Sequence, residues 1–349
     1  MRALILGFAC AAIAAAAPAT SRPTFYKDVL PVLQKNCQTC HRPGEAGPMS
    51  FLYYESTRPW AKSIKDAVAT KKMPPWFADP QYGHFANNRS LAQSDIDTLV
   101  AWVDTGANAG NPADAPQPIT FTEGWSIGKP DVVFQMPKAF DVPASGTLDY
   151  RYVILHTNFT EDKYVQLAEA RPSDREHVHH IIAFIRESGS PWLKGAPAGV
   201  AFVPDKNGEG GGFGGDFLAG YAPGTIPDRL KPGQAKLIKA GSDIVVQLHY
   251  TADGKPGEDR SKVGLIFSKE TPSERVLTLA AADHKFVIPA GDPDYRVDSR
   301  VTLQHDSTLT MMLPHMHLRG KNFSYRVVFP DGKTRELLYV PHYSFSWQL

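Results

Sequence analysis

Two cysteines and a histidine stand at a spacing that suits one particular chemistry. Cys37, Cys40 and His41 belong to the sequence Cys-Gln-Thr-Cys-His, which has the spacing of covalent c-type haem attachment. In such a site the two thiols form thioether bonds to the porphyrin, and the histidine is the proximal ligand of the iron. The chain's other cysteine, Cys10, lies in an N-terminal segment with the features of a secretory signal. A thioredoxin-like redox pair also reads C-x-x-C, but no βαβ pattern surrounds these residues.

A haem held only by His41 would leave one iron position for a second ligand. Met73 is the predicted ligand, because Pro74 and Pro75 follow it and restrict the backbone on which it is held. A thioether ligand raises the reduction potential of the iron and is typical of electron-transfer haems. Met49 is the rival ligand, and it lies closer to His41 in the sequence. The alternative role for Met73 is to fill a gap in an apolar core.

Residues 94–103 are predicted to form an amphipathic helix downstream of these ligands. Ser94 is its expected N-cap, Gly106 is its expected stop, and apolar residues recur at helical spacing between them. A C-x-x-C-H motif, a later Met-Pro-Pro and a final helix carrying Trp102 occur in the same order in small class I cytochromes c. Residues 22–111 resemble that family, which implies a small all-α haem domain over residues 20–112.

The N-terminus and the charge balance restrict where this protein works and what it binds. Residues 1–19 combine a basic Arg2, an Ala-rich apolar run and the small residues Ala17-Pro18-Ala19, which predicts a cleaved signal peptide. We therefore expect a secreted or periplasmic bacterial protein without an integral membrane segment in the mature chain. The 37 basic and 36 acidic side chains nearly cancel, so nothing indicates a nucleic-acid partner.

After a Pro- and Ala-rich linker at residues 113–119, the sequence changes character. Short runs of β-branched and aromatic residues alternate with turn residues, and the chain contains 29 prolines and 28 glycines among its 349 residues. This pattern is typical of antiparallel β-sandwiches. The predicted strands cover residues 131–134, 150–155, 163–167, 180–185, 243–250 and 323–329. The predicted fold class is therefore multidomain, with a small all-α domain followed by all-β antiparallel sandwich domains.

Several of the twelve histidines lie in or beside these strand-like runs: His177, His179, His180, His249, His315 and His317. Residues i and i+2 of a strand face the same way, so His315 and His317 can bind one metal ion together. The same rule pairs His177 with His179 and turns His180 to the other face. Imidazoles with a thioether suit copper, and zinc is the competing metal. A single histidine such as His249 is more often a hydrogen-bonded core residue than a ligand.

A second resemblance arises from three stretches of the β-rich part. They are Val-His-His-Ile-Ile-Ala-Phe at 178–184, Val-Val-Gln-Leu-His-Tyr at 245–250, and His-Met-His-Leu-Arg-Gly-Lys at 315–321, which a Tyr-Arg-Val follows. On these stretches, residues from about 120 to 349 resemble the copper type II, ascorbate-dependent monooxygenases, the family of the peptidylglycine-hydroxylating enzyme and dopamine β-hydroxylase. The resemblance implies two consecutive sandwiches, at residues 120–282 and 283–349, that carry one copper each and face across a solvent gap.

The resemblance also implies a set of ligands. The electron-transfer copper would be bound by His179, His180 and His249, which requires a bulge or twist that lets adjacent histidines converge. The copper that binds dioxygen would be bound by His315 and His317, the catalytic pair. The family's methionine ligand is missing, because no methionine follows Met316, and the second sandwich is therefore expected to be truncated. Met311, Met312 or His305 could substitute for that ligand, but nothing in their spacing recommends them over a missing segment.

One further departure limits the substrate. The peptide-amidating enzyme has an arginine two residues before its H-x-H, where this chain has Leu313, so peptide amidation is not supported. The expected function is a copper-dependent monooxygenase that uses dioxygen and a small organic substrate, with the haem relaying electrons from a periplasmic donor. One alternative is a non-catalytic electron-transfer or copper-binding cytochrome. Another is a carbohydrate- or partner-binding module whose histidines belong to its core.

Overall fold

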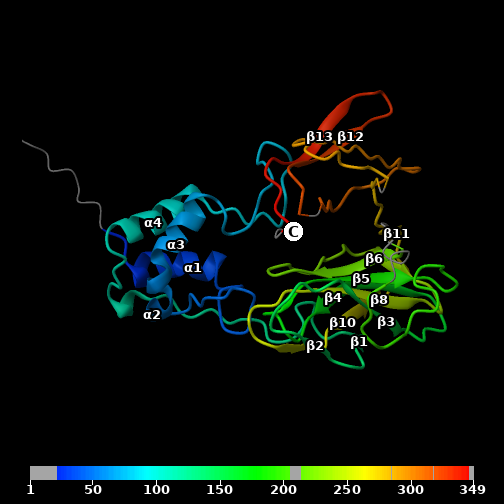
Figure 1. Cartoon of the computed structure of the whole chain (residues 1–349), viewed down its shortest axis with the longest axis horizontal. Coiled ribbons are helices and arrows are strands. Elements are labelled where there is room, and N and C mark those ends of the chain that lie inside the picture. The colour runs from blue at the N-terminus through cyan, green and yellow to red at the C-terminus, as the bar shows by residue number, and fades with distance from the viewer. Residues whose placement is uncertain (1–21, 205–213, 284, 317, 346–349) are drawn as a thin grey trace, which may run out of the picture.

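Helices occupy the first part of the chain, and strands form most of the regular structure after it (Figure 1). The computed structural model describes residues 22–204, 214–283, 285–316 and 318–345. The predicted signal peptide at 1–19 and the predicted copper ligand His317 lie outside the described residues. No helix among the described residues is both long enough and apolar enough to span a bilayer.

The helical part has an apolar core of its own. Its elements are η1 (Phe25–Val29), α1 (Leu30–Asn36), α2 (Tyr54–Thr57), η2 (Arg58–Trp60), α3 (Ala61–Ala69), α4 (Gln93–Asp104) and η3 (Pro112–Asp114). Phe25, Leu33, Leu99 and Trp102 have no exposed surface and pack together in its centre. Burying a side chain of this size stabilises a fold by roughly 1.5–3 kcal/mol.

Helix α4 confirms the predicted helix but not its predicted cap. The helix begins at Gln93, its N-cap is Ala92, and no side chain caps it. The backbone carbonyl of Ala92 already accepts hydrogen bonds from the amides of Asp95 and Ile96, so Ser94 lies inside the first turn. The end was predicted correctly, because α4 stops at Asp104 and Gly106 takes a φ of 102°, a left-handed conformation that glycine adopts without strain.

Residues from about 132 to 275 form two packed sheets. One sheet has the order β1 (Val132–Gln135), β10 (Lys262–Phe267), β4 (Lys163–Arg171), β7 (Gln234–Ile238) and β11 (Glu274–Arg275). The other has the order β3 (Arg151–His156), β8 (Asp243–Tyr250), β5 (Val178–Arg186) and β6 (Asp216–Tyr221). A short ladder joins β2 (Phe140–Val142) to β9 (Gly257–Asp259). Neighbouring strands are antiparallel except β7 and β11.

Alternation along the strands fills the space between the two sheets. Ile244, Val246, Leu248 and Tyr250 of β8 all belong to the core that also contains Val165 and Leu265 from the facing sheet. Successive side chains of a strand point to opposite faces, so His249 lies on the outer face of its sheet. The first predicted sandwich is therefore present, and its outer face is available for a site.

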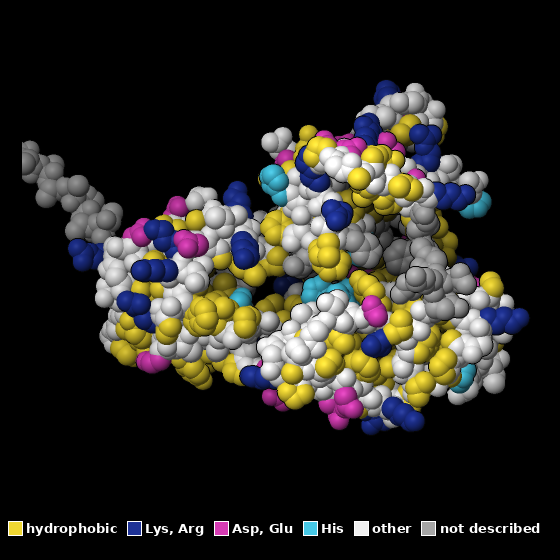
Figure 2. All heavy atoms as spheres, in the orientation of Figure 1, with side chains coloured by type: hydrophobic (Ala, Val, Ile, Leu, Met, Phe, Trp, Pro, Cys, Tyr) yellow, Lys and Arg dark blue, Asp and Glu magenta, His cyan; other side chains and the backbone are white. Residues whose placement is uncertain are grey.

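The last part of the chain has one hairpin, formed by β12 (Phe323–Val328) and β13 (Thr334–Val340). Among the described residues after 283, this hairpin is all that forms of the predicted second sandwich. It packs instead on the segment after α3, where Trp76, Phe77 and Ala78 join its apolar cluster. Figure 2 shows hydrophobic side chains on the surface of the C-terminal part, and Leu303 and Leu309 are more than half exposed there.

Candidate metal centre

Three histidines meet on the outer face of the four-stranded sheet. His180 of β5 is paired directly with His249 of β8. The preceding pair in the ladder is Val178 with Tyr250, so β5 advances by two residues while β8 advances by one. His179 is thus the additional residue of a β-bulge, which lets neighbouring side chains turn to the same face. Two adjacent histidines can converge on one ion only through a bulge or twist of the strand, and the bulge at His179 provides it.

The three imidazoles surround one point. Their ring centroids are 5.0 to 5.3 Å apart in all three pairs, and one nitrogen from each lies within 4.8 Å of the others. The Nδ1 atoms of His179 and His180 are 3.1 Å apart. Nitrogen ligands bind metal ions such as zinc at about 2.0–2.1 Å, so small side-chain rotations suffice to bring all three to one ion. The residues present therefore fit a metal site with three imidazoles.

The surroundings partly cover this site and favour the neutral form of His179. Burial lowers the pKa of His179 below its ordinary value, which favours the uncharged imidazole that binds metal ions. Tyr150 lies 4.7 Å from the His249 ring and 5.6 Å from the His180 ring, centroid to centroid. Phe345 stacks on His179 at 6.0 Å with an interplanar angle of 15°. Neither Tyr150 nor Phe345 has a sequence signal that marks it as part of the site.

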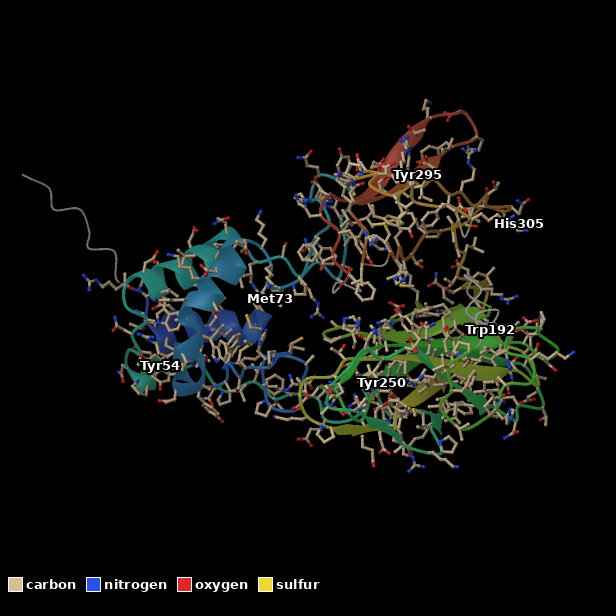
Figure 3. The ribbon with its side chains drawn as sticks, in the orientation of Figure 1. Tyr54, Met73, Trp192, Tyr250, Tyr295 and His305 are labelled. Carbon is tan, nitrogen blue, oxygen red and sulfur yellow. The ribbon has the colours of Figure 1, made fainter. Side chains whose placement is uncertain are left out.

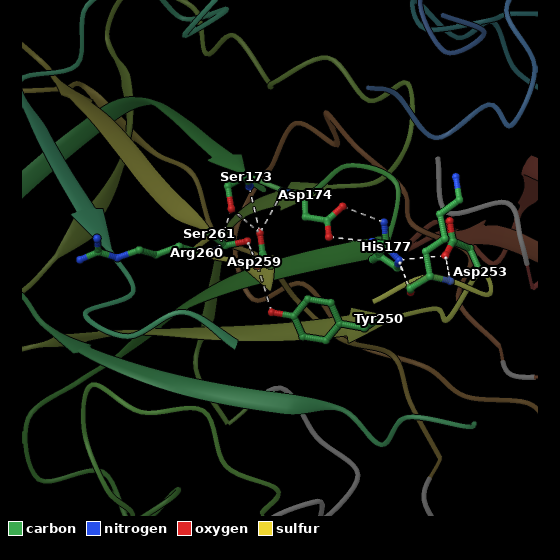
Figure 4. Close-up of polar contacts among 9 residues, drawn as sticks. Ser173, Asp174, His177, Tyr250, Asp253, Asp259, Arg260 and Ser261 are labelled. Carbon is green, nitrogen blue, oxygen red and sulfur yellow. Dashed lines mark hydrogen bonds and ion pairs between the residues drawn. The ribbon is translucent and has the colours of Figure 1, made fainter. Parts of the chain in front are cut away.

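A buried polar network fixes the segment that leads into the metal site (Figure 4). Asp259 accepts hydrogen bonds from the Ser173 amide and hydroxyl, the Asp174 amide, the Tyr250 hydroxyl and the Ser261 hydroxyl. The Asp259 side chain is fully buried, so each of these bonds also avoids the cost of an unpaired buried carboxylate. The network joins the loop before β5 to the end of β8, and it therefore fixes both strands that carry the histidines.

His177 belongs to this hydrogen-bond network and not to the group formed by His179, His180 and His249. Its Nδ1 lies 2.7 Å from the Asp174 carboxylate, and its Nε2 lies 3.0 Å from that of Asp253. These carboxylates and the backbone carbonyl of Lys255 raise the pKa of His177 against the opposing effect of burial. The pairing of His177 with His179 that simple strand alternation predicts is wrong, because the bulge changes the alternation between these residues.

The predicted haem-attachment residues, Cys37, Cys40 and His41, form a single turn at the end of α1. The amides of Cys40 and His41 both donate to the carbonyl of Cys37. The two cysteines form no disulfide, and burial raises the pKa of the Cys37 thiol to about 12. The His41 ring stacks on Phe51 at 4.5 Å, and burial lowers its pKa. Two unpaired thiols and an imidazole on one turn, beside an apolar core, fit covalent haem attachment.

The two candidate axial methionines differ in environment. Met73 follows α3 with 40% of its surface exposed, and Figure 3 shows it on the side of the helical part that faces the rest of the chain. Met49 packs half-buried against the helical core. An exposed thioether has few packing contacts to lose when it turns towards an iron. Met73 therefore stays our predicted ligand.

The second predicted copper site is less regular than the first. His315 was expected on a strand, but residues 311–316 are irregular, since Pro314 cannot donate to a strand ladder. Tyr343 holds this segment, because its hydroxyl accepts from the Met316 amide at 2.9 Å and donates to the Met316 carbonyl at 2.5 Å. Of the substitute ligands, Met312 packs in the hairpin cluster, Met311 is 42% exposed, and His305 lies at the outer edge of the C-terminal part (Figure 3).

Comparison with known proteins adds no relative. No model of a known protein family matches the chain, and a search of curated proteins finds no match.

Proposed function

We propose that this chain is an exported oxidoreductase that combines haem c with copper and acts as a copper-dependent monooxygenase. The observation that carries the proposal is the convergence of His179, His180 and His249 on adjoining strands. An adjacent pair and a distant single histidine can meet only if the chain builds a bulge for them. The electron-transfer copper site of the copper type II monooxygenases has this ligand pattern.

Each candidate residue then has a distinct task. His179, His180 and His249 hold one copper ion, and His315 and His317 hold the second. Cys37 and Cys40 attach the haem, and His41 and Met73 bind its iron. When bound, these groups would supply the two electrons and the activation of dioxygen that insertion of one oxygen atom into a C–H bond requires.

The protein's own contribution at the first site is orientation and exclusion of water. The paired strands hold His180 opposite His249, and the Asp259 network holds the loop from which His179 follows. Phe345 and Tyr150 cover the imidazoles, so an organic substrate has little direct access to this ion. Such a covered site suits electron storage and transfer, and leaves the chemistry on dioxygen to the pair at 315 and 317.

The proposed function is tested by metal analysis followed by turnover. The exported protein, loaded with copper and given a reductant, should incorporate one atom of isotopically labelled dioxygen into a small organic substrate. His249→Ala should abolish incorporation and lower the bound copper. His156→Ala is the matched control, because His156 lies on β3 of the same sheet with its side chain 59% exposed. Wild-type protein that binds neither copper nor zinc stoichiometrically would contradict the proposal and favour a binding module.

The haem part has its own test. Denatured protein should keep a haem stain that Cys37→Ala/Cys40→Ala removes, since thioether bonds survive denaturation. Met73→Ala should remove the weak absorption of a thioether-to-iron bond, and Met49→Ala should leave it. Haem that dissolves into acidified organic solvent from the wild type would show that the attachment is not covalent. Loss of the absorption in Met49→Ala alone would make Met49 the ligand.

A second candidate function is electron transfer without oxygen chemistry. It is favoured because, among the described residues, His179, His180 and His249 form the one group of three or more His, Cys, Asp or Glu side chains placed so that it could hold a metal ion. A chain with one complete copper site and a haem can exchange electrons with a partner but lacks a site for dioxygen. Tight copper binding together with reversible reduction of copper and haem, and no incorporation of labelled oxygen, would favour this function.

A further inference from the structure

The turn that carries the haem-attachment cysteines lies directly against the sandwich. A Cβ atom placed on Gly224 would be 3.4 Å from the Cys40 sulfur and 2.8 Å from a guanidinium nitrogen of Arg89. Gly224 has a φ of 86°, which glycine adopts without strain. It belongs to residues 221–225, which begin at the last residue of β6 and which we call the docking turn. The positive φ favours glycine here, and a Cβ would displace the flexible end of Arg89 while meeting Cys40 at ordinary contact distance.

An ion-pair cluster holds the same two parts together. One guanidinium nitrogen of Arg175 donates to both carboxylate oxygens of Glu45, at 2.9 and 3.0 Å. Arg42 donates to Glu45 at 2.7 Å. The side chains of Arg42, Glu45 and Arg175 are 16%, 14% and 24% exposed, so salt screens these pairs less than surface pairs. The Arg175 guanidinium also lies 5.8 Å from the ring centre of Tyr221 in the docking turn.

The residues on the sandwich side of this contact are connected to the metal ligands by short paths. Tyr221 of β6 is paired with Ile181 of β5, and Ile181 directly follows His180. Arg175 lies between Asp174 and His177, both of which belong to the Asp259 network ahead of His179. The contact with the haem-attachment turn and the three-histidine site therefore share one rigid part of the sheet.

We propose that the docking turn, with Arg175 and Glu45, is the fixed contact through which electrons pass from the haem to the three-histidine copper site. This inference rests on the proposed function. With both groups bound, the step would move one electron from a ferrous haem held by Cys37, Cys40 and His41 to a cupric ion held by the three histidines, giving ferric haem and a cuprous ion. No bond forms or breaks and no proton moves. The path runs from the Cys40 thioether to Gly224, along the chain to Tyr221, and across the strand pair to Ile181 and His180.

A fixed contact between the turn that carries Cys40 and the sandwich differs from electron delivery by a haem on a flexible linker. A tether raises the effective concentration of the haem but leaves its orientation variable. Here Glu45 receives two guanidinium groups, one from its own turn and one from the sandwich. Removing its charge leaves the partly buried Arg175 without its carboxylate, and the contact between the two parts is weakened. The interface should therefore loosen while both cofactor sites keep all their ligands.

The test compares Glu45→Gln with Glu55→Gln in protein that carries haem and copper. Glu55 is an exposed residue of α2, and its substitution serves as the control. The haem is reduced without oxygen or substrate, and its oxidation by cupric ion in the same molecule is followed by its absorbance. We expect Glu45→Gln to slow this oxidation by at least about tenfold and to speed hydrogen exchange at residues 221–225. Copper affinity, and copper reduction by added ascorbate, should stay unchanged in both variants.

The outcomes separate this inference from the function on which it rests. Absence of haem or copper in the wild type overturns both, and metal analysis shows it before any kinetics. Haem and copper present, with wild-type electron transfer in Glu45→Gln, overturns the docking contact alone. If Glu45→Gln does not fold, Gly224→Ala replaces it, because alanine is strained at this φ and its Cβ displaces the Arg89 guanidinium beside Cys40. Unchanged transfer in Gly224→Ala, with hydrogen exchange showing the turn displaced, would likewise overturn the inference.

Discussion

The two candidate copper sites differ in what holds them. His180 and His249 are neighbours on paired strands over a core in which Ile181, Ile244 and Leu248 are fully buried. His315 lies in an irregular segment that is fastened by the hydroxyl of Tyr343. The first site therefore has its geometry before any metal binds, whereas His315 of the second site lies outside any strand ladder among the described residues. Preformed ligands bind more tightly because less conformational entropy is lost on binding.

The contrast indicates that local stability differs between the regions around the two sites. Strand pairing and a full apolar core surround the site that we assign to electron transfer. The region that we assign to dioxygen has exposed apolar side chains, such as Leu303 and Leu309, and one hairpin. Local stability within a protein ranges from near zero to the stability of the whole fold. The two sites should lie towards opposite ends of that range.

Hydrogen exchange should show the largest difference between the regions. Amides of β5 and β8 should exchange only through global unfolding, with a free energy in the usual range of about 5–15 kcal/mol. Amides of residues 285–311 have no strand ladder and should exchange with little protection. The measurement is native-state exchange followed by mass spectrometry. Equal protection in both regions would contradict the difference that we infer.

A matched pair of leucine substitutions should show the next largest difference. Leu265 in the sandwich core has no exposed surface, whereas Leu309 is 60% exposed. Leu265→Ala should lower the free energy of unfolding by about 2–5 kcal/mol, because it leaves a cavity. Leu309→Ala should change it by no more than about 0.5 kcal/mol. Denaturant titration of both variants gives the comparison, and a large loss in Leu309→Ala would show that this surface is packed.

The smallest effect is expected when the hydrogen bonds between Tyr343 and the backbone of Met316, beside His315, are removed. Tyr343→Phe removes the hydroxyl that bonds to both the amide and the carbonyl of Met316. The loss should be about 0.5–1.5 kcal/mol for each net hydrogen bond, and copper binding at His315 should weaken while binding at His249 stays constant. Tyr53→Phe, at a tyrosine that is 67% exposed, is the control. Weakened binding at His249 would show that the sites are coupled through the C-terminal segment.

Much of the first sandwich can be predicted from the sequence, because its strands carry their own signal. The predicted strand at 243–250 coincides with β8, and 180–185 falls within β5. Both are nearly continuous runs of β-branched and large apolar residues, which pack well in a sheet. The sequence pattern does not predict strands β6 and β10, because Gly220 and Gly264 interrupt their runs of strand-forming residues. Gly264 is needed since a Cβ there would lie 2.7 Å from the Trp125 ring.

The contacts between distant segments could not be predicted. The bulge at His179 is a property of the β5–β8 register, which strand alternation alone does not contain. Phe345 reaches His179 from more than 160 positions away, and Arg175 meets Glu45 across 130 positions. Such contacts are fixed by how the whole chain packs, and single-sequence patterns report only local preferences. The predicted, incomplete second sandwich is represented among the described residues by the β12–β13 hairpin, and the predicted strand at 323–329 does not show what that hairpin packs against.

The most direct test of the account is a copper titration of the 349-residue chain and two variants. We predict one tight and one weak class in the wild type, with three imidazole nitrogens coupled to the tightly bound cupric ion in its electron spin resonance spectrum. His249→Ala should weaken the tight class by more than about 100-fold, and His315→Ala should remove only the weak class. Two equally tight classes, or a tight class that survives His249→Ala, would contradict the claim that the bulged strand pair builds the principal metal site.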